Sequence, residues 1–205
     1  MDKQKYLDDL KEIKDMMERS SRFISLSGLS GVFAGLFALL GAWLAYTTIY
    51  TGQEYFGFRQ AELSRENLLL LLLIAGGTLL LSIGAGIFFT TRKARRQGLK
   101  LWDYQTKRLL INLFIPLAAG GILCLMLLLR GYVGLLAPLT LIFYGLALVN
   151  ASKYTYTEIR SLGIAEIVLG LLATHFIGFG LLFWALGFGV LHIVYGILMQ
   201  IKYGS

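Results

Sequence analysis

Long apolar runs between clusters of charged residues constrain this chain more than any other feature of its sequence. Only 15% of its residues are charged, against roughly 25% in a soluble domain, and they leave uncharged stretches long enough to cross a bilayer. About 20 helical residues span a hydrocarbon core of ~30 Å. The sequence therefore predicts an all-α fold, a polytopic membrane protein built as a six-helix transmembrane bundle.

The predicted organisation has two regions. Residues 1–22 are expected to form a cytoplasmic amphipathic helix, because Tyr6, Leu10, Ile13 and Met17 recur at helical spacing. Residues 23–205 are expected to form the transmembrane domain, with spans at about 24–48, 67–90, 109–129, 132–150, 161–177 and 180–201. Only a short apolar turn around Phe179 separates the last two spans, so a re-entrant pair of helices stays an alternative.

Lysine and arginine are distributed unequally between the two sides of the predicted bundle. Sixteen lie in the N-terminal segment, the 91–108 loop, the 151–160 loop and the tail, whereas three lie on the other side. Basic residues are retained on the cytoplasmic side of a membrane. The distribution therefore predicts that both termini are cytoplasmic, and this agrees with six spans, because an even number of spans places both termini on the same side.

Glu166 is an isolated ionisable residue in the predicted fifth span, where a charge costs at least ~2.5–3.5 kcal/mol at mid-depth. His192 is its expected partner, because an antiparallel turn centred on Phe179 places the two residues at the same depth. Small residues at helical spacing beside each of them predict that both face the protein interior. Two interpretations of this intramembrane polar pair stay open: a structural clamp between helices, or a proton-sensitive site.

Two further groups of residues are expected near the cytoplasmic side. Pro116 removes one helix hydrogen bond and frees the carbonyl of Asn112, and Tyr144 and Asn150 are expected to complete a polar pocket there. A plain kink is the alternative to a pocket. Basic residues beside a span bind anionic lipid headgroups, or they serve only to set the topology. The basic residues expected to contact headgroups are Arg92, Lys93, Arg95, Arg96 and Lys100.

The sequence carries none of the motifs HExxH, GxSxG, CxxC or the P-loop, so no catalytic residue, metal site or cofactor is predicted. The net charge of +7 does not indicate nucleic-acid binding, because the excess lies in loops beside spans. The preferred function is a non-enzymatic sensor, scaffold or regulator that contacts a protein partner through residues 1–20. The alternatives are a small proton-coupled transporter or channel that uses Glu166 and His192, and a lipid-modifying enzyme that uses the same pair.

Two segments carry a resemblance to known proteins. Residues 183–199, FWALGFGVLHIVYGILM, and residues 141–150, LIFYGLALVN, resemble a family of six-span bacterial inner-membrane proteins with no assigned activity. The resemblance implies six spans and a location in the bacterial inner (plasma) membrane. It implies no substrate, partner or catalytic residue.

Overall fold

The computed structural model describes residues 26–49, 65–98 and 101–203. These residues form helices and connecting turns with no strand among them, which confirms the all-α prediction for this part of the chain. The expected helix over residues 1–22 lies outside the described residues. The principal helices are α2 (Gly28–Ile49), α3 (Arg65–Arg96), α4 (Tyr104–Leu129), α5 (Leu136–Ala151), α6 (Thr157–His175), α7 (Gly180–Trp184) and α8 (His192–Tyr203).

Short segments of other helix types connect several of these helices. A π-helical segment, η4 (Ala185–Leu191), lies between α7 and α8 and makes them one continuous run. The remaining connections are the 3-10 turns η1 (Val133–Leu135), η2 (Ser152–Tyr154) and η3 (Ile177–Phe179).

Within the described residues, five helical segments are long and apolar enough to cross a membrane. They are Gly28–Thr48, Glu66–Arg96, Tyr104–Leu129, Val133–Tyr154 and Ile177–Tyr203. The predicted span at 161–177 corresponds to α6, which is not among them. This helix has only 19 residues, and they include two acidic residues, Glu158 and Glu166, and one arginine, Arg160. Six spans therefore stay a prediction.

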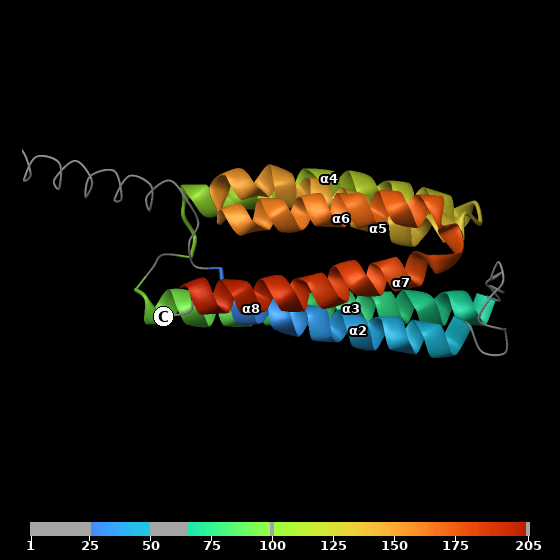
Figure 1. The fold of residues 1–205 in the computed structure, drawn as a ribbon, viewed down its shortest axis with the longest axis horizontal. Helices are drawn as coiled ribbons and strands as arrows, with labels where there is room; N and C mark the ends of the chain where they lie inside the picture. The colour runs from blue at the N-terminus through green and yellow to red at the C-terminus, as the bar shows by residue number, and fades with distance from the viewer. Residues whose placement is uncertain (1–25, 50–64, 99–100, 204–205) are drawn as a thin grey trace, which may run out of the picture.

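The helices lie in two layers (Figure 1). The first layer contains α4, α5 and α6, and the second contains α2, α3 and the run from α7 to α8. The chain passes from the first layer to the second through η3, so the end of the bundle that contains this turn is called the turn end.

Glycine allows close approach of the helix backbones within each layer. A Cβ at Gly31 of α2 would lie 3.2 Å from the Cα of Gly196 in α8. A Cβ at Gly145 of α5 would lie 2.5 Å from the carbonyl oxygen of Gly163 in α6. Small residues at such contacts permit tight helix packing in the absence of a hydrophobic driving force between helices.

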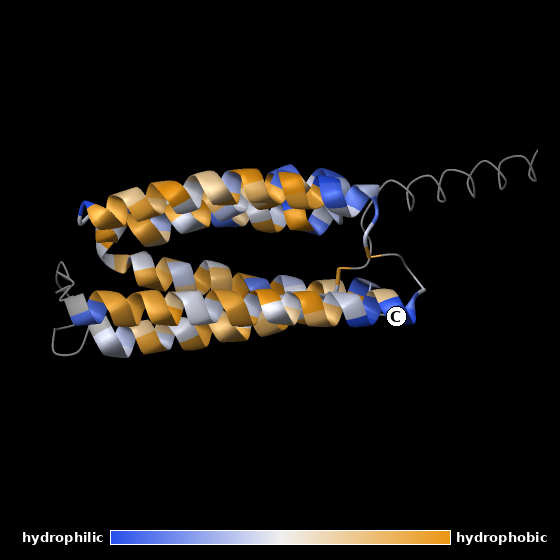
Figure 2. Ribbon diagram, turned by 180° about the vertical axis from the view of Figure 1, so that it is seen from behind, coloured by the Kyte–Doolittle hydropathy of each residue, from blue (hydrophilic) through white to orange (hydrophobic). Residues whose placement is uncertain are grey.

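Hydrophilic residues gather at the end of the bundle opposite the turn end (Figure 2). This end, called the basic end, contains the last turn of α3 with Lys93, Arg95 and Arg96, and the last turn of α8 with Lys202. Lys93 joins separate parts of the chain there, because its Nζ donates to the carbonyls of Leu26 at 3.2 Å and Tyr203 at 2.8 Å.

Candidate functional site

The candidate site is a group of polar side chains, two buried and one partly buried, where the two layers meet. It is called the seam cluster and consists of Tyr144 of α5, Glu166 of α6 and His192 of α8. His192 contributes from the second layer and contacts both of the others: its Nε2 lies 2.7 Å from the Tyr144 hydroxyl, and its Nδ1 lies 3.4 Å from Glu166 Oε1. The structure thus brings the sequence-predicted pair together and adds Tyr144 to it.

The hydrogen bonds of His192 fix where its ring protons lie. Nδ1 is 3.0 Å from the carbonyl oxygen of Gly187, and because a carbonyl only accepts, Nδ1 carries a proton. In a neutral ring Nε2 then accepts the hydrogen bond that the Tyr144 hydroxyl donates. The ring is therefore held from both sides, by α5 and by its own helix.

The carboxyl group of Glu166 has a different environment. Its side chain is fully buried, and neither of its oxygens has a hydrogen-bond partner within the described part of the chain. An isolated buried carboxylate is very costly, so the group must hold a proton or face a charged imidazole. Two states satisfy this condition: protonated Glu166 beside neutral His192, or a Glu166 carboxylate beside a His192 imidazolium. Both states hold the same number of protons. Either way, the pair shares one titratable proton.

A glycine in η4 makes room for this carboxyl group. A Cβ at Gly187 would overlap Glu166 Oε2 and Leu141 Cδ2. The side chains of Glu166 and Leu141 are both fully buried, so neither has free space to retreat into. Single π-helical turns are rare and occur often at functional sites, and this one places Gly187 against the carboxyl and starts α8 at His192.

The predicted polar pocket of Asn112, Tyr144 and Asn150 is only partly assembled. Asn150 Nδ2 of α5 donates to the carbonyl oxygen of Asn112 at 3.0 Å, and this is the carbonyl that Pro116 leaves without its helical partner. The Asn112 side chain donates to the carbonyl of Arg108 in its own helix. The Tyr144 hydroxyl bonds to His192 and does not complete this pocket.

The expected headgroup-binding residues also have different roles. Lys93 is partly buried and donates to backbone carbonyls of the protein, whereas Arg92, Arg95 and Arg96 are exposed. Lys100 lies outside the described residues. Three of the five expected headgroup-binding residues are thus exposed and available for contact with other molecules.

Contacts at the basic end also join the two layers. Glu158 of α6 accepts from Lys202 Nζ at 2.5 Å and from the Tyr203 hydroxyl at 3.0 Å. Burial alone would raise the pKa of Glu158, but these hydrogen bonds and the charge of Lys202 hold it below its ordinary value. Tyr156 stacks on Tyr203 with ring centroids 4.1 Å apart. Burial, then the neighbouring Tyr203 and Glu158, raises the pKa of Tyr156 to about 12.

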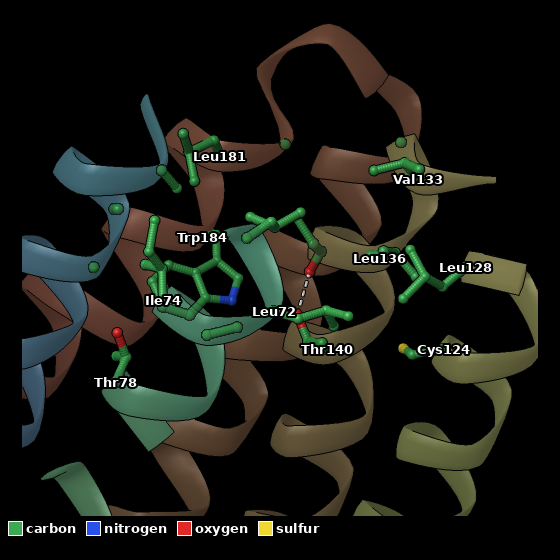
Figure 3. A pocket seen from close by; sticks show the side chains of 18 of the residues that line it. Leu72, Ile74, Thr78, Cys124, Leu128, Val133, Leu136, Thr140, Leu181 and Trp184 are labelled. Carbon is green, nitrogen blue, oxygen red and sulfur yellow. Dashed lines mark hydrogen bonds between the residues drawn. The ribbon is translucent and has the colours of Figure 1, made fainter. Parts of the chain in front are cut away.

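A large apolar cavity, called the inter-layer cavity, lies toward the turn end (Figure 3). Its volume is about 1070 Å³, and residues of α2, α3, α4, α5 and α7 line it. Glu166, His192 and Tyr144 are not among the residues that line it. Trp184 lines the cavity and packs on Phe188 with tilted rings, and Phe188 in turn packs on Tyr144, with 4.9 Å between ring centroids at each step.

Sequence reasoning missed the cavity and the contact between Tyr144 and His192. A tyrosine within an apolar span was the available signal, because a buried hydroxyl needs a hydrogen-bond partner. Its spacing from His192 along the chain carried no information about which partner it finds. No family model, no curated protein and no solved structure matches this chain.

Proposed function

We propose that this chain is a non-enzymatic integral membrane protein, a sensor, scaffold or regulator that acts through contacts with other molecules. The observation that carries the proposal is the enclosure of the seam cluster. Glu166 is fully buried and His192 is 7% exposed, and neither lines the inter-layer cavity. The burial of Glu166 and His192 favours the structural interpretation, in which the pair is a polar clamp between the two layers.

The same geometry weighs against the two alternative functions. An acid or base must come within about 2.6–3.2 Å of the proton that it transfers, either directly or through one water. The residues that line the cavity include no Asp, Glu, Lys, Arg or His. A lipid substrate in the cavity would therefore meet no acid or base from these residues, and a proton path through it would have no carrier.

The proposed membrane placement has both termini in the cytoplasm of a bacterium, with α6 as the sixth span. Support for α6 comes from its packing, because Glu166, the charge that makes this helix less apolar, is covered by α5 and η4 and does not face outward. The basic end then faces the cytoplasm, in accord with the 16-to-3 split of lysine and arginine. In this proposal Arg92, Arg95 and Arg96 contact anionic headgroups, and residues 1–20 contact a protein partner.

The first test is proton flux in proteoliposomes, measured with a trapped pH-sensitive dye. The wild-type chain and Glu166→Gln are compared, because the substitution keeps the shape of the side chain and removes its charge. The proposal expects the same background flux for both. A wild-type flux that Glu166→Gln abolishes would instead support proton-coupled transport.

The second test addresses the partner. Chemical crosslinking in native membranes compares the full chain, the chain lacking residues 1–20, and Glu166→Gln. A defined crosslinked partner is expected with the full chain and with Glu166→Gln, and it is expected to be lost on deletion. Thermal unfolding in detergent shows whether the shortened chain keeps a folded bundle. An unchanged set of crosslinked partners after deletion would contradict the role of residues 1–20.

A further inference from the structure

The inter-layer cavity has features of a binding site that the proposed function does not use. Its volume of about 1070 Å³ is slightly above the ~300–1,000 Å³ typical of small-molecule sites. Small residues on α2 create part of this space, because Ala42 and Ala45 each present only a methyl group to it. An apolar space of this size does not hold water well, so its contents should be apolar as well.

One opening of the cavity lies between α3 and α4. Leu72 of α3 and Leu125 of α4 both line the cavity, yet they are 47% and 55% exposed. A residue that is exposed and also lines a cavity marks where the cavity meets the surroundings. Both helices are long and apolar enough to cross a membrane, so these surroundings are the hydrocarbon of the bilayer.

One polar group points into this apolar space. The indole nitrogen of Trp184 is directed toward the cavity (Figure 3), and its N–H makes no hydrogen bond within the described residues. Thr140, the neighbouring hydroxyl, already donates to the carbonyl of Ala137 at 2.8 Å. An indole N–H only donates, so the occupant that suits the cavity carries a hydrogen-bond acceptor on an otherwise apolar body.

The depth of Trp184 identifies which acceptor this is. The residue lies four positions after Gly180, where α7 begins at the turn end, which is ~6 Å along the helix. Tryptophan is enriched at the membrane–water interface, where its amphipathic ring sits at the level of the lipid headgroups. The ester carbonyls of phospholipids lie at the same boundary between headgroup and hydrocarbon.

We propose that the inter-layer cavity binds one acyl chain of a phospholipid from the leaflet at the turn end, with an ester carbonyl accepting from the Trp184 N–H. The chain enters between α3 and α4 and fills the space beside Ala42 and Ala45. This inference stands apart from the proposed function, because it needs neither a partner nor any role for residues 1–20. Trp184 contacts Phe188, and Phe188 contacts Tyr144, so two aromatic rings connect the bound chain to the seam cluster.

The test is fluorescence quenching of Trp184 by lipid. The full chain with Trp43→Phe and Trp102→Phe retains Trp184 as its one tryptophan, since the sequence contains three. It is reconstituted in phosphatidylcholine vesicles that contain a rising fraction of phosphatidylcholine brominated along one acyl chain. Strong quenching that saturates at a low brominated fraction is expected from a bound chain.

A matched pair of substitutions on α4 separates the cavity from the outer surface. Cys124→Phe fills the cavity, because Cys124 lines it, whereas Ile122→Phe adds the same ring at a site that is 57% exposed and does not line it. Quenching is expected to fall severalfold with Cys124→Phe and to stay unchanged with Ile122→Phe. Equal quenching in both variants, or no quenching in the single-tryptophan chain, would overturn the proposal.

A second measurement keeps the proposal testable if Cys124→Phe fails to fold. A benzophenone amino acid at position 128, which lines the cavity on α4, is photoactivated in phosphatidylcholine vesicles, and the mass of the product is determined. An adduct with one phosphatidylcholine supports the proposal. A crosslink to another segment of the same chain, or to a second copy of it, would show that protein fills the cavity and would refute lipid binding.

Discussion

Gly187→Ala is the substitution that most directly tests the packing around Glu166. The added methyl group would overlap Glu166 Oε2 and Leu141 Cδ2, and both of these side chains are fully buried. Extra methylene-sized groups in a packed interior cost about 1–3 kcal/mol. Alanine regains up to ~1 kcal/mol of helix propensity over glycine. We therefore expect Gly187→Ala to lower the free energy of unfolding by about 1–2 kcal/mol.

The assay is reversible unfolding in an SDS titration, followed by circular dichroism. Gly84→Ala on α3 is the matched control, because a Cβ there meets nothing within 4 Å, and it is expected to be neutral or slightly stabilising. Glu166→Ala removes one of the two groups that the methyl would overlap. Its combination with Gly187→Ala should therefore cost less than the sum of the single substitutions, by about 0.5–3 kcal/mol. Wild-type stability for Gly187→Ala, or strict additivity in the double variant, would refute the proposed contact.

Two further predictions concern other contacts. The pKa of Glu158 is lower in the folded chain than its ordinary value of 4.5, so its stabilising contribution is present above that pH and is lost as the pH falls below it. Thermal unfolding from pH 7 to pH 3 should show that Glu158→Gln loses part of the wild-type acid sensitivity, and identical slopes would contradict this. Asn150→Leu removes the hydrogen bond to the Asn112 carbonyl and should destabilise the bundle by about 0.5–1.5 kcal/mol. This loss should shrink in a Pro116→Ala background, where a helical N–H again reaches that carbonyl, and an unchanged loss in SDS titration would argue against the assignment.

Local composition explains how much of the fold was predictable. The spans follow from runs of apolar residues, which specify helix and membrane compatibility without reference to the rest of the chain. The α6 helix is the exception, because Glu158, Arg160 and Glu166 lower its apolar character while its packing hides the last of these. Whether such a helix crosses the membrane depends on what covers its charges, and this is a property of the neighbouring helices.

The candidate site was likewise predictable from the sequence only in part. The equal depth of Glu166 and His192 could be worked out from the sequence, because two helices joined by a short turn have a register fixed by residue numbers. The freed carbonyl of Asn112 also follows from Pro116 alone. The partner of Tyr144 could not be derived, since α5 is not joined to α8 by a turn and no local rule sets their rotation.

The sequence by itself determined the helices, their approximate ends and the unequal distribution of basic residues between the two sides, because each of these depends on neighbours along the chain. Only the tertiary structure decided that the helices form two layers, that Lys93 donates hydrogen bonds to backbone carbonyls, and that a cavity opens between α3 and α4. These features depend on how helices far apart in sequence rotate and pack against one another. Packing is a balance over many side chains, and no single segment carries the information to fix it.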